Sequence, residues 1–232
     1  MLSIRALDQY YGESHTLWGV DLEVPAGQCT CVMGRNGVGK TTLMKAVMGE
    51  VAVDSGSLRY ADGVELTQRR VEDRSRLGIG YVPQGRQIFP LLTVEENLRT
   101  GLAARGDGAK RIPERIYELF PVLAEMRHRR GGDLSGGQQQ QLAIGRALVL
   151  EPKLLILDEP GEGIQPNIVA QIGEVIRRLI REDGLTVLLV EQKLPFARRY
   201  ADRFAILDRG RPVAEGTIDA LDDELIKTHL TV

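Results

Sequence analysis

The feature that most constrains the fold of this chain is the segment from Gly34 to Thr41. Its sequence, GRNGVGKT, consists of a glycine, four further residues and Gly-Lys-Thr, and it lies between an apolar run and a helix-like stretch. Glycines let backbone N–H groups curl around an anion, and the following helix N-terminus adds partial positive charge. Lys40 can reach terminal phosphates and Thr41 can ligate magnesium. The segment predicts a nucleoside triphosphate site; the alternative is a glycine-rich turn that merely joins a strand to a helix.

We therefore treat the whole loop and the first residues of the helix as candidate nucleotide-binding residues. These residues are Gly34, Arg35, Asn36, Gly37, Val38, Gly39, Lys40, Thr41 and Thr42.

Two adjacent carboxylates, Asp158 and Glu159, form a second candidate site after the apolar run 154–157. An apolar strand in a parallel sheet delivers its last residues to the sheet edge at which the glycine-rich loop also opens. Asp158 suits magnesium, directly or through water, and Glu159 could orient or deprotonate an attacking water. The alternative is a strand followed by a solvated acidic turn. Beside the glycine-rich loop, the pair favours nucleotide hydrolysis.

A third candidate site is Ser135 to Gln138, within the sequence LSGGQ that introduces a helix. Two glycines before a helix, with Ser135 near its N-cap, expose N–H groups and a hydroxyl to an anion. One triphosphate cannot readily use both this surface and the glycine-rich loop. A dimer resolves the conflict if Ser135, Gly136, Gly137 and Gln138 cover the nucleotide held by the other subunit. Without a partner, the same residues would be an ordinary helix cap.

The order of expected elements indicates an α/β fold. Early strands in close succession suggest an antiparallel sheet, and later strands that alternate with helices suggest a parallel one. Helical patterns dominate residues 85–150, which we expect to form an inserted helical subdomain between residues 1–84 and 151–232 of one nucleotide-binding domain. The expected strands are 2–7, 18–24, 29–33, 78–82, 154–157, 186–190, 203–207 and 211–214. The expected helices are 40–48, 94–104, 113–119, 137–150, 167–182, 194–200 and 218–228.

Composition limits the classes of partner. The formal net charge of −2 provides no overall basic field for nucleic acid, and the arginines around His128 are interpreted as a solvated face. Cys29 and Cys31 should point to one face of a strand as buried thiols rather than as metal ligands. No apolar run approaches the roughly 20 residues that a spanning helix needs, so any membrane association would come through a partner.

Together these motifs resemble the nucleotide-binding subunits of ABC transporters, and the resemblance extends over essentially the whole chain. It implies a P-loop NTPase fold with a RecA-like core, ATP and Mg²⁺ as ligands, and ATPase activity coupled to transport. By the resemblance, Tyr11 is the aromatic residue that stacks on adenine, and Gln84 touches magnesium and links the core to the helical lobe. The alternatives are a partly exposed tyrosine and a polar strand end.

Two positions depart from the family pattern. Gln192 stands where a histidine usually contacts the γ-phosphate; an amide can donate a hydrogen bond but cannot carry a proton at neutral pH. This favours Glu159 as the base, with Lys40 and Gln192 as the other candidate catalytic residues. Gln165 replaces the usual aspartate of the dimer-contact loop, which puts the usual cross-dimer polar contacts in doubt. The candidate metal ligands are Thr41, Gln84 and Asp158.

Residues 138–141, 162–166 and 190–192 resemble the branch of ABC importers that transports branched-chain amino acids and urea. Within this branch the urea-type ATP-binding subunit is the nearer likeness, and the branched-chain amino acid importer is the alternative. The resemblance implies a second ATP-binding subunit, in a homo- or heterodimer, two permeases, an indirect receptor partner, and a peripheral position at the cytoplasmic face of the inner membrane. Two further functions fit part of the pattern, a non-transport ABC ATPase in DNA repair or translation and a small-molecule P-loop kinase. The former usually carries two cassettes or a long coiled coil, and the latter would need an acceptor pocket and a lid.

Overall fold

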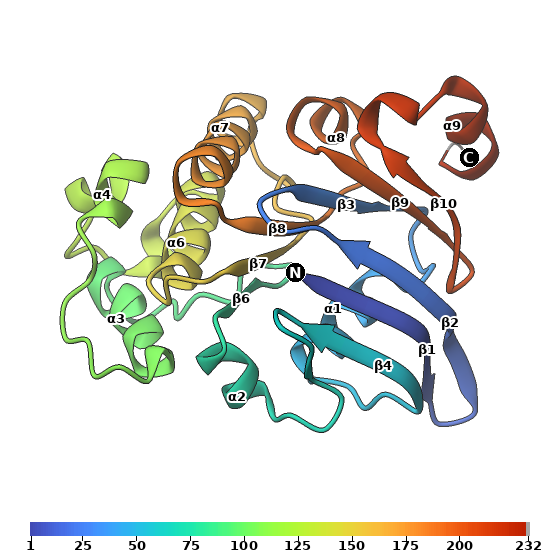
Figure 1. The fold of residues 1–232 in the computed structure, drawn as a ribbon. Helices are drawn as coiled ribbons and strands as arrows, with labels where there is room; N and C mark the ends of the chain where they lie inside the picture. The colour runs from blue at the N-terminus through green and yellow to red at the C-terminus, as the bar shows by residue number, and fades with distance from the viewer. Residues whose placement is uncertain (231–232) are drawn as a thin grey trace.

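Two β-sheets and a group of helices meet around the glycine-rich loop in the computed structural model, which describes residues 1–230 (Figure 1). The antiparallel sheet has the order β2-β1-β4-β5. Its strands are β1 (Leu2–Tyr11), β2 (Ser14–Val24), β4 (Ser55–Tyr60) and β5 (Val64–Glu65). It forms the lower right part of the view in Figure 1.

The second sheet has the order β10-β9-β3-β8-β7-β6, and its strands are parallel except for the β9–β10 pair. Its strands are β3 (Cys29–Met33), β6 (Ile79–Val82), β7 (Leu154–Asp158), β8 (Thr186–Val190), β9 (Arg203–Asp208) and β10 (Arg211–Thr217). Every residue of β3, β7 and β8 is buried, as expected for apolar strands covered on both faces. Because β3, β8 and β7 are parallel neighbours, the loops that follow them lie together at the carboxyl end of the sheet.

Helices cover this sheet on both faces and form the lobe at the left of Figure 1. The helices are α1 (Lys40–Met48), α2 (Val71–Arg76), α3 (Val94–Arg105), α4 (Arg115–Leu119), α5 (Pro121–Glu125), α6 (Gly136–Leu148), α7 (Pro166–Asp183), α8 (Leu194–Tyr200) and α9 (Asp223–His229), with 3-10 turns at Gly131–Asp133 and Ile218–Ala220. Sequence signals define several ends: Thr93 and Glu96 form a capping box at α3, and Gly184 ends α7 in the left-handed conformation.

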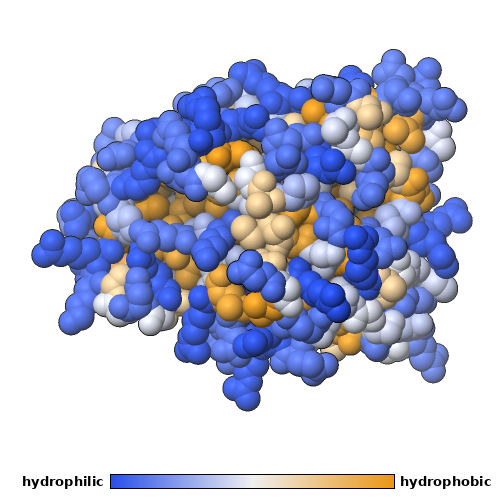
Figure 2. All heavy atoms as spheres, in the orientation of Figure 1, coloured by the Kyte–Doolittle hydropathy of each residue, from blue (hydrophilic) through white to orange (hydrophobic). Residues whose placement is uncertain are grey.

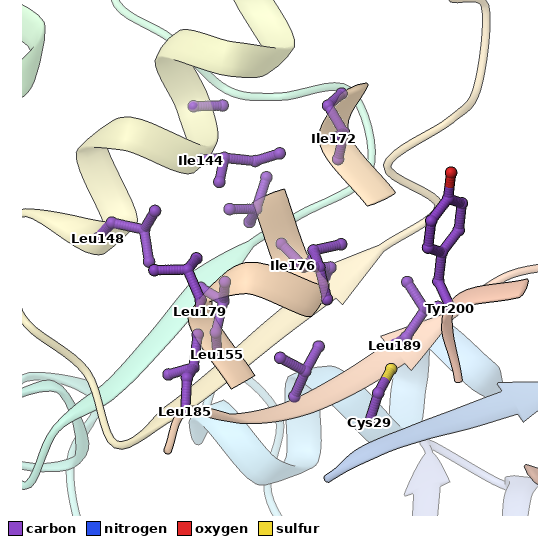
Figure 3. Close-up of a cluster of buried hydrophobic side chains, with 14 of the residues drawn as sticks. Cys29, Ile144, Leu148, Leu155, Ile172, Ile176, Leu179, Leu185, Leu189 and Tyr200 are labelled. Atoms are coloured by element: carbon purple, nitrogen blue, oxygen red, sulfur yellow. The ribbon is translucent and has the colours of Figure 1, made fainter. Parts of the chain in front are cut away.

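The core consists of two clusters of buried side chains, one on each face of the parallel sheet. Cys29 and Cys31 lie in the cluster beneath α6, α7 and α8, whereas Val32, the residue after Cys31, packs with α1 and the antiparallel sheet on the opposite face. Figure 3 shows Cys29, Leu155 and Leu189 from neighbouring strands beneath residues of these helices. Both thiols are buried, which confirms the prediction, and burial raises the pKa of Cys29 to about 12. Within residues 1–230, no three or more His, Cys, Asp and Glu side chains are grouped so that they could hold a metal ion.

The predicted α/β fold is confirmed, with some differences in its elements. The strands β4 and β5 and the helices α2 and α5 were not predicted, because they are short or polar and depend on pairing and packing with distant residues. The predicted helix 218–228 is instead a 3-10 turn and α9, separated at Leu221, whose ψ of 88° is not helical. The predicted subdivision into 1–84, 85–150 and 151–232 stays a prediction.

The surface in the orientation of Figure 1 is mostly hydrophilic, with apolar side chains visible in hollows between charged ones (Figure 2). Among residues 1–230, no helix combines the length and the apolar character that crossing a bilayer would require.

Candidate functional site

The glycine-rich loop connects β3 to α1, and its shape depends on glycine. Gly34 has φ 145°, and a Cβ there would lie 2.3 Å from the Leu207 carbonyl oxygen. Gly39 has φ 105° and is the N-cap of α1, without a side-chain cap. The first N–H groups of α1 are thus free of a capping side chain at a helix end that favours anions.

Lys40 is held by the loop that precedes it. Its ammonium donates hydrogen bonds to the carbonyl oxygens of Gly34 and Arg35, each at 2.8 Å, and the side chain is 5% exposed. Burial lowers the pKa of Lys40, although the nearby carboxylates of Glu159 and Asp158 oppose this shift. The sequence therefore folds into a preorganised loop with a fixed positive charge beside the helix N-terminus.

Asp158, the last residue of β7, has the properties of a cation ligand. Its side chain is 1% exposed, and neither carboxylate oxygen meets hydrogen-bond geometry with any partner in residues 1–230. Burial raises its pKa to about 6, while the nearby Thr41 hydroxyl lowers it and Glu159 raises it. A buried carboxylate without a partner is costly, and a hard cation that prefers oxygen ligands, such as Mg²⁺, would compensate this charge. The residues present therefore fit the ion.

Glu159 follows Asp158 in a strained backbone conformation. Its φ is 49°, in the left-handed region, and its N–H donates to the Val190 carbonyl at 3.0 Å. Non-glycine residues in this region cost roughly 1–3 kcal/mol and are retained where the surrounding structure determines them. The bend turns the Glu159 carboxylate out of the strand toward the glycine-rich loop, where one oxygen lies 3.9 Å from the Lys40 ammonium.

Gln192, after β8, connects the two motifs directly. Its side-chain amide nitrogen donates to the Asn36 side-chain oxygen Oδ1 at 2.6 Å and also to Glu159 Oε1. The amide therefore spans from the glycine-rich loop to the acidic strand end. The two donor hydrogens of one amide are both used in this arrangement.

Lys40, Glu159 and Gln192 line one cavity of about 440 Å³, which we call the phosphate cavity, whereas the buried Asp158 is not among its lining residues. Its lining residues are Thr16, Asn36, Gly37, Gly39, Lys40, Thr41, Thr42, Gln84, Glu159, Glu162 and Gln192. The structure thus brings together most of the predicted residues from β3–α1, β6, β7 and β8. Thr16 and Glu162 were not predicted as site residues; Glu162 accepts a hydrogen bond from the Gln84 amide at 3.0 Å.

Tyr11 lies outside this cavity. It ends β1 in the hairpin with β2 and is 49% exposed, and it is not among the cavity-lining residues. Thr16, on the neighbouring strand, lies at the cavity instead. Contact of Tyr11 with an adenine base stays a prediction.

Ser135 also lies outside the phosphate cavity, in a second hollow that we call the signature hollow. Ser135 is the N-cap of α6, where it accepts from the Gln138 N–H at 3.4 Å, and Gln138 Oε1 accepts from the Ser135 N–H at 2.9 Å. The hollow also contains Gly136, Gly137 and Gln165 and has no lining residue in common with the phosphate cavity. The two surfaces are therefore separate hollows within one copy of the chain.

Comparison with known proteins shows which family has this sequence and fold. The family model for "ABC transporter" matches residues 17–162. The chain belongs to the ABC transporter family. It is 45% identical to the high-affinity branched-chain amino acid transport ATP-binding protein BraG of Pseudomonas aeruginosa, over 95% of this chain and 94% of that protein. It is 38% identical to "Probable branched-chain amino acid transport ATP-binding protein LivF" of Archaeoglobus fulgidus, over 95% and 94% of the two chains.

A solved ABC cassette shows the same fold with its products bound. A dimeric structure of an ATP-binding cassette in a post-hydrolysis state with ADP and phosphate superimposes with a TM-score of 0.84 and 26% identity, covering 94% of this chain and 99% of that one. The chain is thus an ABC ATPase, an ATP-binding subunit that uses ATP with Mg²⁺. The predicted family, activity and ligands are confirmed; the urea-type likeness is not, because the relatives described above carry branched-chain amino acid names.

Proposed function

We propose that this chain hydrolyses ATP to energise an ABC importer of branched-chain amino acids. The fixed arrangement of Lys40, Glu159 and Gln192 at one cavity carries the hydrolytic part of this proposal. The similarity to BraG and LivF over nearly the whole chain supports branched-chain amino acids as the transported substrate. It favours branched-chain amino acids over urea.

The residues of the phosphate cavity have separate roles in this proposal. Backbone N–H groups of the loop 34–39 and of the first turn of α1 bind the phosphates, together with Lys40. Thr41, Gln84 and Asp158 would hold Mg²⁺, which neutralises charge on the phosphate oxygens when bound. Glu159 orients the water and accepts its proton as the oxygen attacks the γ-phosphorus, and the bond from this phosphorus to the ADP oxygen breaks. Gln192 can turn one amide N–H from Asn36 or Glu159 to a phosphate oxygen.

Two copies, or this chain and a second ATP-binding subunit, would form the complete site. The separate position of the signature hollow supports this arrangement, because Ser135 and Gly136 of one subunit can then cover ATP bound at the phosphate cavity of the other. ATP binding closes the dimer by adding contacts across the interface. Hydrolysis reopens it, because separated ADP and phosphate no longer connect the two halves.

A cleft between the core and the helical lobe fits the proposed contact with a permease. It measures about 590 Å³ and includes Val71 of α2, Tyr81 of β6 and Phe89, which is 48% exposed. Leu91 nearby in the chain is 79% exposed. Pro83, directly before Gln84, also lines the cleft. A permease segment bound there would therefore be coupled to changes in the phosphate cavity through Gln84. The subunit would then be peripheral, at the cytoplasmic face of the membrane, with a substrate receptor acting through two permeases.

Reconstitution of this chain with its cognate permeases in proteoliposomes tests the substrate. ATP hydrolysis in proteoliposomes should rise when the cognate receptor is loaded with leucine, isoleucine or valine and should stay basal with urea. Stimulation by urea alone would contradict the substrate assignment. A Glu159→Gln subunit in the same vesicles should abolish the stimulation, which shows that the hydrolysis measured belongs to this chain.

A further inference from the structure

Glu191 is a buried carboxylate next to the candidate catalytic residues, and the mechanism above gives it no role. It follows the last residue of β8 and is 3% exposed. Its Oε1 accepts hydrogen bonds from the backbone N–H groups of Gln192 at 2.9 Å and Lys193 at 3.0 Å. Burying a carboxylate is costly unless hydrogen bonds compensate it. Here they hold the backbone on both sides of the Gln192 side chain.

The second oxygen, Oε2, faces the loop that follows β7. A Cβ added to Gly161 would lie 3.3 Å from it, so the carboxylate packs against the backbone two residues after Glu159. Lys193 crosses to the same residue: its ammonium donates to the Gly161 carbonyl oxygen at 2.8 Å. The turn after β8 and the loop after β7 are therefore joined beside the point where Gln192 meets Glu159.

We propose that Glu191 is a positioning residue for Gln192. Its carboxylate fixes the backbone of residues 192 and 193, and Lys193 fixes this turn to Gly161, so that the Gln192 amide points at Glu159 and Asn36. The inference rests on the proposed function, because it requires that Gln192 and Glu159 act in ATP hydrolysis. Glu191 itself touches neither ATP nor the attacking water.

Substitutions at Glu191 should separate turnover from nucleotide binding. In Glu191→Ala both backbone hydrogen bonds are lost, and kcat should fall at least about ten-fold, within the ~100-fold that misplacing a reacting group can cost. The KM for ATP should change less than about three-fold, because the phosphates are bound by other residues. Glu191→Gln keeps an acceptor but loses the charge, which weakens the two bonds, and should have a smaller effect. Glu215→Gln, on the exposed face of β10, is the matched control and should retain wild-type turnover.

A double-mutant comparison shows whether Glu191 acts through Gln192. Gln192→Ala should lower kcat, and Glu191→Ala combined with Gln192→Ala should be no slower than Gln192→Ala alone. Multiplied effects, or a Gln192→Ala variant with wild-type turnover, would overturn the proposal. Hydrogen exchange gives a readout independent of activity: the amides of residues 192 and 193 should exchange faster in Glu191→Ala, and unchanged exchange would also contradict it.

If Glu191→Ala does not fold, Glu191→Gln and Lys193→Met test the same contacts with less disruption of the core. Lys193→Met removes the bond to Gly161 and should lower kcat without raising the KM for ATP more than about three-fold. If neither variant lowers kcat, the proposal is wrong. Glu159→Gln distinguishes this failure from failure of the proposed function. If Glu159→Gln stops ATP hydrolysis while the Glu191 variants hydrolyse ATP at the wild-type rate, only the positioning role is rejected. If Glu159→Gln itself hydrolyses ATP at the wild-type rate, the proposed mechanism is rejected.

Discussion

The ammonium of Lys40 lies 3.9 Å from a carboxylate oxygen of Glu159, and both side chains are largely buried. Lys40 is not hydrogen-bonded to this carboxylate but to the carbonyl oxygens of Gly34 and Arg35. The positive charge is thus fixed by its own loop, while Glu159 is fixed by a strained backbone and by Gln192. This arrangement keeps the proposed base near the charge that would bind the phosphates without joining the two in a direct hydrogen bond.

Glu159→Gln should keep ATP binding and lose hydrolysis. The amide cannot accept the proton of the attacking water, and removing a general base typically costs ~10²–10⁴ in rate. The variant should therefore accumulate as an ATP-bound dimer, detectable by light scattering after size exclusion, with phosphate release reduced by at least about 100-fold. Phosphate release at the wild-type rate would refute the base assignment.

Asp158→Asn should stabilise the metal-free protein at neutral pH. Burial raises the Asp158 pKa from 3.8 to about 6. The folded state thus binds this proton more tightly than the unfolded state, so its contribution is fully present below about pH 4 and is lost as the pH rises to about 6. At 1.36 kcal/mol per pKa unit, the ionised carboxylate costs about 3 kcal/mol at neutral pH.

The variant removes this charge, and its free energy of unfolding at pH 7.5 should be about 1–3 kcal/mol higher than that of wild type, with a smaller difference at pH 4.5. Thermal unfolding at both pH values measures the effect. Added Mg²⁺ and ATP should raise the Tm of the wild type more than that of the variant. Equal Mg²⁺-dependent shifts in the two proteins would exclude Asp158 as a metal ligand.

Gly34→Ala and Gly37→Ala form a matched pair within the loop. Both glycines have positive φ, but a Cβ at Gly34 meets a backbone carbonyl at 2.3 Å, whereas no atom lies within 4 Å at Gly37. We expect Gly37→Ala to cost about 1 kcal/mol from backbone strain, and Gly34→Ala to cost more than about 2 kcal/mol because the backbone must move. Urea unfolding compares the two, and equal losses would show that the contact with Leu207 does not determine the loop.

Arg74→Met should weaken the end of α1 opposite the phosphate cavity. The guanidinium is 1% exposed and donates to the carbonyl oxygens of Ala46 and Val47 at 2.6 and 2.7 Å. Without it these carbonyls lose their cationic partner, and the free energy of unfolding should fall by about 2–4 kcal/mol. Arg70→Met, whose native side chain is 82% exposed, should change it by less than about 0.5 kcal/mol.

The parts of this molecule that local chemistry determines could be predicted from the sequence. The apolar strands 29–33, 154–158 and 186–190 lie side by side and deliver the glycine-rich loop, Glu159 and Gln192 to one edge. The cap at Ser135 and the buried thiols also follow from residue type and spacing. In each case the pattern over a few residues determines the local structure, and the parallel sheet then places the strand ends together.

Features that depend on distant partners could not be predicted. The strand β4 has the sequence SGSLRY, and its pairing with β1 relies on Gly56, where a Cβ would lie 2.4 Å from the Ala6 carbonyl oxygen. Thr16 reaches the phosphate cavity only because the β1–β2 hairpin lies over the loop, and no motif marks it. The bond from the Lys193 ammonium to the Gly161 carbonyl oxygen likewise joins two loops that are distant in the sequence.

Complementation between two inactive variants tests the shared ATP site most directly. In mixtures of Lys40→Ala and Ser135→Ala chains, a mixed dimer has one site with both defects and one site with neither. If ATP is hydrolysed between the phosphate cavity of one copy and Ser135 of the other, mixing equal amounts should restore up to about one quarter of wild-type phosphate release, for random pairing of independent sites. Activity no higher than the mean of the two separate variants would contradict a site shared between two copies.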